Sequence, residues 1–309
     1  MKRIFYLILL VFLLINCKSK EVNYIEYYSK INEADSVFRY EKDTLKAIKI
    51  YKNVFKEFEP RNQYGKRELE HYIEFCDKLK MSFGGKKTLR KLINLEAPNR
   101  EYFYGYGILK KYGIDSLEVV RRFDKWEKSL DKVFVDSFKV AYERDQYYRK
   151  NFDEKLLLLN DRKNEDLLLK LIKSNNFPTI DKIGYAGGPD YPIKIITLHI
   201  GSSTKRFEFF KEELYKCVKK GYIRPIVYAE FVDRECVFGI RRDTTNSIYA
   251  AYRSSHAIND SSQVNRNRKK IGLPSLYHNR DMIKEFERYL DVMYEKKMKL
   301  KSKNNQINE

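Results

Sequence analysis

The sequence predicts a mainly α-helical protein, with helical hairpins at the N-terminus followed by an α-rich domain that contains a small β element (α+β). Apolar residues recur at three- and four-residue steps through most of the chain, which is typical of amphipathic helices. Turn-forming residues are dense at 185–192, which predicts a loop. Two segments after it, 225–240 and 247–252, are rich in Val, Ile, Tyr and Phe and predict a small sheet.

The first 16 residues have the features of a secretory signal peptide. Two basic residues precede an apolar run at 4–15, which is shorter than the roughly 17 to 25 residues of a membrane-spanning helix. Residues 14–17, with the sequence Leu-Ile-Asn-Cys, resemble the lipobox of bacterial lipoproteins. That resemblance implies that Cys17 receives a diacylglyceryl group, with palmitate-like chains, and becomes the mature N-terminus.

Two or three acyl chains hold a protein durably at a membrane, because each buried CH₂ contributes about 0.8 kcal/mol. Residues 17–23 then form a lipidated tether, and membrane lipid is the first predicted partner. No aspartate follows Cys17 directly, which by analogy favours the outer membrane of a cell envelope. Two alternatives stay open: an uncleaved signal anchor, or a secreted protein with a chance cysteine.

Composition limits the remaining possibilities. An apolar fraction of 43% is sufficient for a real core, and 25 Tyr and 19 Phe predict an aromatic one. The formal charge of +19 favours anionic partners such as an envelope polymer or an acidic protein. Export argues against nucleic acid. The alternative is that lysine serves only to keep the helices soluble. No zinc-ligand spacing and no phosphate-binding loop is present, so we expect no metal and no cofactor.

We predict that residues 24–130 form a helical region. A helix at 44–58, which Asp43 caps and Pro60 ends, follows a helix at about 25–40. A second hairpin, at 68–95, is broken at Gly84 and Gly85. The run from residue 34 to 60 resembles a tetratricopeptide hairpin, and such pairs form either a peptide-binding groove or plain scaffold.

We predict that residues 137–299 form the α-rich domain and that residues 300–309 form a disordered tail. The expected helices lie near Trp126 and at 137–159, 164–173, 207–219 and 281–299, with Gly221 closing the fourth. The apolar run 193–200 fits a buried strand or a buried helix equally well. Cys217 and Cys236 are either a disulfide pair or buried thiols.

Within residues 145–278, the order of short motifs resembles a bacterial domain family known only as a domain of unknown function, which often follows helical repeats. The motifs are a polar opening before a leucine-rich helix, a turn, a histidine segment, an Asp-Arg segment and a basic helix ending in Gly-Leu-Pro. Here they are residues 164–166, 177–178 with Gly184, 198–201, 228–234, and Arg268 with 271–274. The resemblance implies a fold and no activity.

Three residues are candidates for chemistry. His199 stands in an apolar segment and is either a general base or a hydrogen-bonded core histidine. Asp233 and Arg234 either bind a substrate anion or orient His199, or else form a buried ion pair. The sequence therefore favours a membrane-anchored binding or scaffold protein, and the alternative is an exported hydrolase that uses these three residues.

A basic cluster near the C-terminus is the candidate anion site. Its members are Arg266, Arg268, Lys269 and Lys270. The alternative interpretation is that these side chains form the solvated face of a helix.

Overall fold

The structure is a computed structural model that describes residues 22–61, 67–103, 105–150, 153–185, 191–238, 247–252, 258 and 260–307. Over these residues the chain is mainly α-helical, as the sequence predicts, and it forms no β-strand. The leader, Cys17 and most of the 185–192 loop lie outside the described residues. Among the described helices, none combines the length and the apolar character needed to cross a membrane.

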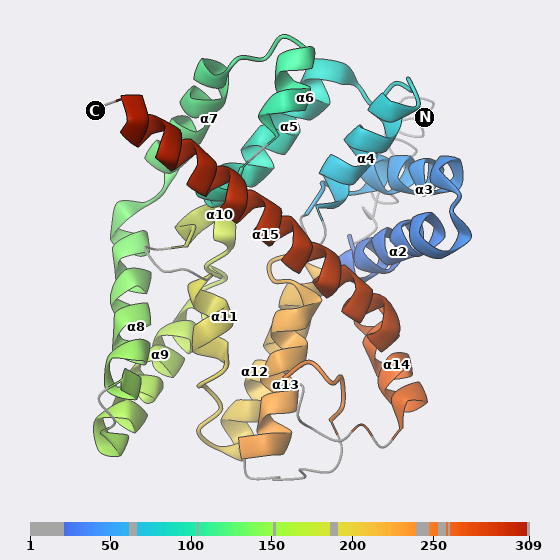
Figure 1. The fold of residues 1–309 in the computed structure, drawn as a ribbon. Helices are drawn as coiled ribbons and strands as arrows, with labels where there is room; N and C mark the ends of the chain where they lie inside the picture. The colour runs from blue at the N-terminus through green and yellow to red at the C-terminus, as the bar shows by residue number, and fades with distance from the viewer. Residues whose placement is uncertain are drawn as a thin grey trace, which may run out of the picture.

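Figure 1 shows the helices as a body with one long C-terminal helix across its front. The N-terminal half contains α2 (Tyr24–Ser36), the π-helix η1 (Val37–Glu41), α3 (Thr44–Glu57), α4 (Glu68–Lys78), α5 (Gly85–Glu96), the 3-10 helix η2 (Ala97–Tyr102), α6 (Tyr106–Lys111) and α7 (Ser116–Ser129). The C-terminal half contains α8 (Lys132–Lys150), α9 (Glu154–Lys173), α10 (Ile180–Ile183), α11 (Pro192–Thr197), α12 (Thr204–Lys219), α13 (Pro225–Phe238), α14 (Ser261–Lys270) and α15 (Leu276–Ile307).

The first two helices form the hairpin expected at the N-terminus. The Asp43 carboxylate caps α3 by accepting a hydrogen bond from the Lys46 N–H at 2.8 Å, as the sequence predicts. The predicted helix at 44–58 is confirmed to within one residue. The helix expected at 25–40 ends earlier, at Ser36, and the chain continues as the π-helical turn η1.

The break in the second hairpin also lies where the sequence predicts it. α4 ends at Lys78 and α5 begins at Gly85. Gly84 has a φ of 94°, in the left-handed region, and a Cβ there would lie 2.6 Å from Thr88 Oγ1. Only glycine fits this turn without strain.

The N-terminal helices bury an aromatic core. The rings of Tyr27 and Tyr28 meet edge to face with their centroids 5.2 Å apart, and both are almost fully buried. Burial and the nearby Glu68 carboxylate raise the pKa of Tyr27 well above its usual value. Its hydroxyl lies 2.8 Å from Glu68 Oε1, so the buried carboxylate has a donor. The hairpins are therefore joined by polar as well as apolar contacts.

A second core lies among α8 to α13, and α13 is a helix where the sequence predicted a strand. Its side chains are buried on nearly all sides, including Val227, Tyr228, Phe231 and Val232. Its charged residues do not gather on one exposed face, since Asp233 and Glu235 are buried, so the 3.6-residue period is weak and the β-branched and aromatic composition suggested a strand. The proposed small β element is not supported: 225–238 is helical, and 247–252 is irregular.

Two further boundaries differ from the sequence-based expectation. α9 begins at Glu154, capped by Asp153, whose side chain accepts a hydrogen bond from the Leu156 N–H at 3.0 Å. The polar residues 160–163, expected to separate two helices, lie inside α9. The ambiguous run after the turn-rich loop is helical as α11, whereas α12 and its end near Gly221 agree with the prediction.

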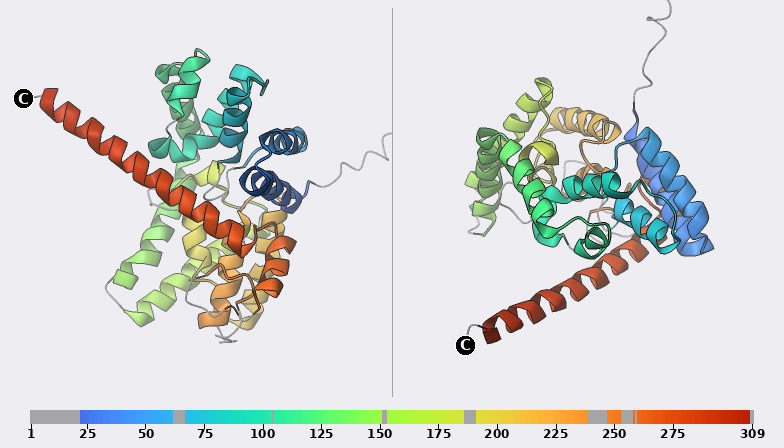
Figure 2. Two further views of the ribbon diagram at one scale, coloured as in Figure 1. Left: turned by 45° about the vertical axis from the view of Figure 1, so that its right-hand side comes forward. Right: turned by 90° about the horizontal axis from the view of Figure 1, so that it is seen from above.

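The last helix is longer than predicted at both ends. α15 begins at Leu276, after Ser275, whose hydroxyl accepts a hydrogen bond from the His278 N–H at 3.2 Å. It continues to Ile307, so residues 300–307, expected as a disordered tail, are helical. This stretch contains no Pro or Gly to interrupt a helix. Figure 2 shows the C-terminal end of α15 standing away from the body.

Helix α2 contacts both cores. Ile25 packs against the second core, although the rest of the helix belongs to the first. Two glycines permit the close approach: a Cβ on Gly221 would lie 2.7 Å from the Tyr24 ring, and one on Gly272 would lie 2.9 Å from Tyr28 Cβ. α2 therefore fixes the position of the two halves relative to each other.

Candidate functional site

His199 lies just after α11 and faces a carboxylate on another helix. Its Nδ1 atom is 2.8 Å from Oδ1 of Asp145, which belongs to α8 and has a fully buried side chain. The other oxygen of Asp145 accepts a hydrogen bond from Gln146 Nε2 at 2.7 Å. The imidazole ring remains 18% exposed. The structure thus gives His199 a partner that the sequence did not suggest, from 54 residues away.

A second carboxylate joins this pair. Asp161, on the first half of α9, places an oxygen so that one ligand atom each from Asp145, Asp161 and His199 all lie within 4.8 Å of one another. Two carboxylates and an imidazole are groups that bind divalent transition metals. They are also groups that exchange protons, so both kinds of chemistry are open to this cluster. We call these three residues the α8–α9 cluster.

The loop that carries His199 is attached to α9 by a buried carboxylate. Glu165 accepts hydrogen bonds from the Ser202 N–H at 3.2 Å, the Ser202 hydroxyl at 3.3 Å and Arg206 Nη1 at 3.0 Å. Arg206 also pairs with Asp166 at 2.7 Å. Because these contacts lie three to seven residues after His199, they limit how far its ring can move.

Amide side chains fix α8 against α9. Asn164 Nδ2 donates to the Ala141 carbonyl at 2.9 Å, and Asn160 Nδ2 donates to the Arg144 carbonyl at 3.2 Å. Both asparagines are buried. Neither asparagine was predicted to form a contact between helices, although a signal was present: they continue, at four-residue steps, the buried stripe to which Leu168 belongs. A polar residue that falls on the same helix face as a row of buried apolar residues is itself expected to be buried and hydrogen-bonded.

Asp233 has different hydrogen-bond partners from His199. Its carboxylate accepts hydrogen bonds from the backbone N–H groups of Ile248, Tyr249 and Ala251 at 2.9, 2.9 and 2.7 Å. In the described part of the chain, no contact joins Asp233 or His199 to each other or to Arg234. The three residues proposed as a catalytic set are therefore not brought together by these contacts.

The basic cluster divides into one buried and three exposed members. Arg268 is 1% exposed and donates to the carbonyls of Pro274 at 2.6 Å and Tyr249 at 2.8 Å. Burial lowers its pKa to about 10. Arg266 is exposed and binds Gln263, and Lys269 and Lys270 are exposed at the end of α14. Arg268 thus holds the 247–252 segment from its carbonyl side while Asp233 holds it from its N–H side.

The cysteines show no bridge between Cys217 and Cys236. Cys217 is a buried free thiol, and burial raises its pKa to about 12. The Cys236 thiol lies 3.8 Å from the Val232 carbonyl and donates a weak hydrogen bond to it. The sequence left open a disulfide or two free thiols, and in the structure both cysteines are free thiols.

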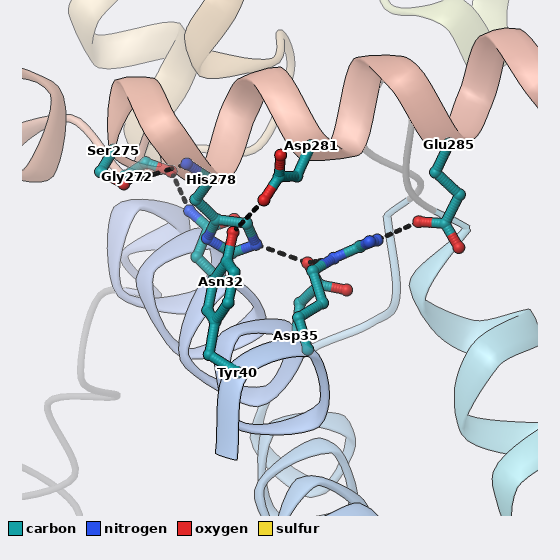
Figure 3. Close-up of polar contacts among 9 residues, drawn as sticks. Asn32, Asp35, Tyr40, Gly272, Ser275, His278, Asp281 and Glu285 are labelled. Atoms are coloured by element: carbon teal, nitrogen blue, oxygen red, sulfur yellow. Dashed lines mark hydrogen bonds and ion pairs between the residues drawn. The ribbon is translucent and has the colours of Figure 1, made fainter. Parts of the chain in front are cut away.

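A second polar cluster connects α2 and η1 to α15 (Figure 3). His278 Nε2 lies 2.5 Å from Oδ2 of Asp35, which is fully buried. Arg39 binds the same Asp35 oxygen at 2.7 Å and also contacts Glu285. Tyr40 donates to Asp281 of α15 at 3.0 Å, and Asn32 Nδ2 donates at 2.9 Å to the carbonyl of Gly272, in the turn between α14 and α15. These contacts attach α15 to the N-terminal hairpin.

No family model, curated protein or solved structure matches this chain.

Proposed function

We propose that this chain is a lipoprotein of the bacterial cell envelope, held at a membrane through an acylated Cys17, and that its helical body is a binding or scaffold module. The observation that carries the proposal is how soon after Cys17 the chain joins the body. α2 begins at Tyr24, and Tyr27 and Tyr28 are already almost fully buried. An anchor at Cys17 would therefore be attached to a firmly packed part of the body.

The length of the tether sets how closely the body would approach the membrane. Six residues separate Cys17 from Tyr24, and an extended chain spans at most about 3.3 to 3.6 Å per residue, which gives roughly 20 Å. The body would thus remain close to the lipid head groups. The net positive charge favours retention of anionic envelope polymer or an acidic protein beside the membrane.

The contacts of Asp233 favour binding over catalysis. Its carboxylate receives three backbone N–H groups, and such a carboxylate is a structural acceptor with little capacity left for substrate. The hydrolase alternative still has one supporting observation, the Asp145–His199 pair. A carboxylate on Nδ1 orients an imidazole and leaves its Nε2 atom for proton transfer. Such an enzyme would use Asp145 in the role that the sequence assigned to Asp233.

Mass spectrometry of the chain extracted from membranes tests the anchor. We expect an N-terminal peptide that begins at Cys17 with the added mass of acyl chains, and loss of membrane attachment in Cys17→Ser. Cys76→Ser is the matched control, because that thiol is buried in the N-terminal core and should leave attachment unchanged. An unmodified sulfur at position 17, or a first residue beyond it, would overturn the proposal.

A binding assay separates the two functions. A binder should retain purified anionic polysaccharide, release it steeply as salt rises, and keep its affinity in His199→Ala. An enzyme of the alternative kind should lose turnover of ester or amide substrates in that variant with its fold intact. Retention that does not depend on salt would contradict the electrostatic account.

A further inference from the structure

The α8–α9 cluster combines ligand types that share one chemistry. Asp145, Asp161 and His199 come from α8, α9 and the loop after α11, and their ligand atoms lie within 4.8 Å of one another. In a site with metal–ligand bonds of about 2.1 Å, ligand atoms are roughly 3 to 4 Å apart. Closing this cluster around an ion would need side-chain shifts on the order of 1 Å. We propose that these three residues bind a divalent transition-metal ion.

The two carboxylates explain why a cation would bind here. The hydrogen bond between His199 and Asp145 joins that pair, and Asp161 adds a second carboxylate beside it. Carboxylates within 4.8 Å of each other repel, more strongly where water is excluded, and Asp145 is fully buried. A divalent cation between them turns that repulsion into two attractions. It would take the place of the proton that His199 and Asp145 now share.

The surrounding contacts hold the ligands in place before an ion arrives. Gln146 occupies the outer oxygen of Asp145 and leaves Oδ1, the oxygen nearest His199, directed into the cluster. Such hydrogen bonds to the outer side of a ligand are typical of metal sites. Asn160 and Asn164 fix α8 against α9. Ligands that need no large rearrangement lose little conformational entropy on binding.

Two arginines near the cluster bind other acceptors. Arg206 pairs with Glu165 and Asp166, and Arg144 donates to Asn164 Oδ1 at 3.2 Å. Two carboxylates and a neutral imidazole carry two negative charges, which match a divalent ion. The imidazole nitrogen favours Zn²⁺ or Mn²⁺ over Mg²⁺ and Ca²⁺, which prefer oxygen ligands alone.

Three protein ligands leave coordination positions for water. Because its ligands come from α8, α9 and the loop after α11, the bound ion would also tie the His199 loop to the α8–α9 hairpin. It is independent of the lipid anchor, so failure of one proposal leaves the other unaffected.

Titration calorimetry on the full-length chain in detergent, freed of metal with EDTA, tests this directly with Zn²⁺, Mn²⁺ and Mg²⁺. We expect one Zn²⁺ or Mn²⁺ ion per chain, much weaker binding of Mg²⁺, and a higher melting temperature of the loaded protein. Asp161→Asn, at a partly exposed position, should weaken the affinity at least 100-fold while the circular dichroism spectrum stays unchanged. Glu154→Gln is the matched control: it removes an exposed carboxylate in the first turn of the same helix, outside the cluster, and should bind like the wild type.

His199→Gln provides a second variant in case Asp161→Asn disturbs the fold. Absorption of the Co²⁺-loaded chain adds a spectroscopic readout, because its visible bands depend on the ligand set and should change in His199→Gln. The proposal is overturned if no transition metal binds below millimolar concentration. It is equally overturned if the affinities of Asp161→Asn and Glu154→Gln are the same, since binding would then lie elsewhere on the surface.

Discussion

Replacing Asp233 by alanine tests whether this residue is structural. The substitution removes a buried carboxylate that accepts hydrogen bonds from three backbone N–H groups of the 247–252 segment. Those N–H groups would be left inside the protein without an acceptor. Arg268, which is buried on the opposite side of the segment, would lose the nearby negative charge that favours its protonated form.

The expected loss follows from these contacts. A hydrogen bond to a charged acceptor contributes about 1.5 to 3 kcal/mol, but three that share one carboxylate are not additive. Removing one partner of a buried charged group costs about 3 to 5 kcal/mol, and we expect Asp233→Ala to lower the free energy of unfolding by that amount. Asp233→Asn should cost less, since Oδ1 can keep its bonds to Ile248 and Tyr249 while the bond to Ala251 is lost.

Urea unfolding followed by circular dichroism measures the loss, and hydrogen exchange locates it. The amides of Ile248, Tyr249 and Ala251 should exchange slowly in the wild type and fast in Asp233→Ala. Asp124→Ala is the control: its carboxylate is 44% exposed and pairs only with Arg100, so about 0 to 1 kcal/mol is expected. Equal stability of the two variants, with protection of the 247–252 amides retained, would refute the structural role.

Three other perturbations test the cores and the junction. Burial raises the pKa of Glu70 to about 7 from 4.5, so the stability due to its protonated form is present below pH 4.5 and lost as the pH rises through 7. Relative to Glu70→Gln, the wild type should lose about 3 kcal/mol of unfolding free energy across that window in pH-dependent urea titrations. Gly272→Ala should cost about 2 kcal/mol or more, because φ is +83° and the new Cβ would lie 2.9 Å from Tyr28 Cβ. Gly107→Ala, with open space around it, should change stability by less than about 1 kcal/mol in the same assay. Cys217, with a pKa of about 12, should resist iodoacetamide at pH 8 and react once urea unfolds the chain, as mass spectrometry of the peptides would show.

Amphipathic helices with capping residues could be predicted from the sequence, and a helix buried on nearly all sides could not. α3 shows the first case: Ile48, Tyr51 and Val54 are buried as the three- and four-residue spacing predicts, and Asp43 caps the helix. Leu45, which the same three-residue spacing places on this face, is 53% exposed. α13 shows the second case: it carries charged residues, but Asp233 and Glu235 among them are buried, so no single exposed polar face reveals the helical period.

The candidate site was predicted only in part. His199 was identified because a histidine inside an apolar run is conspicuous, but its partner came from a helix 54 residues earlier. Asp233 was predicted to act with His199 because both residues border apolar runs. That similarity concerns their neighbours in the sequence and does not predict the distance between them in space. The lipid anchor stays a prediction, because Cys17 lies outside the described residues. The resemblance of the first hairpin to a tetratricopeptide repeat also stays a prediction.

The polar side chains between α8 and α9 explain how one arrangement of this hairpin is selected. Apolar stripes on two helices can pack in several registers, one helical turn apart, at similar cost. A shift of one turn, about 5.4 Å, would carry the Asn164 amide away from the Ala141 carbonyl and the Asn160 amide away from the Arg144 carbonyl. Each misplaced buried amide costs about 1 to 3 kcal/mol, so the wrong registers are excluded by their unpaired polar groups. The same register sets Asp145 and Asp161 beside each other, so the contacts that determine the hairpin also assemble the cluster around His199.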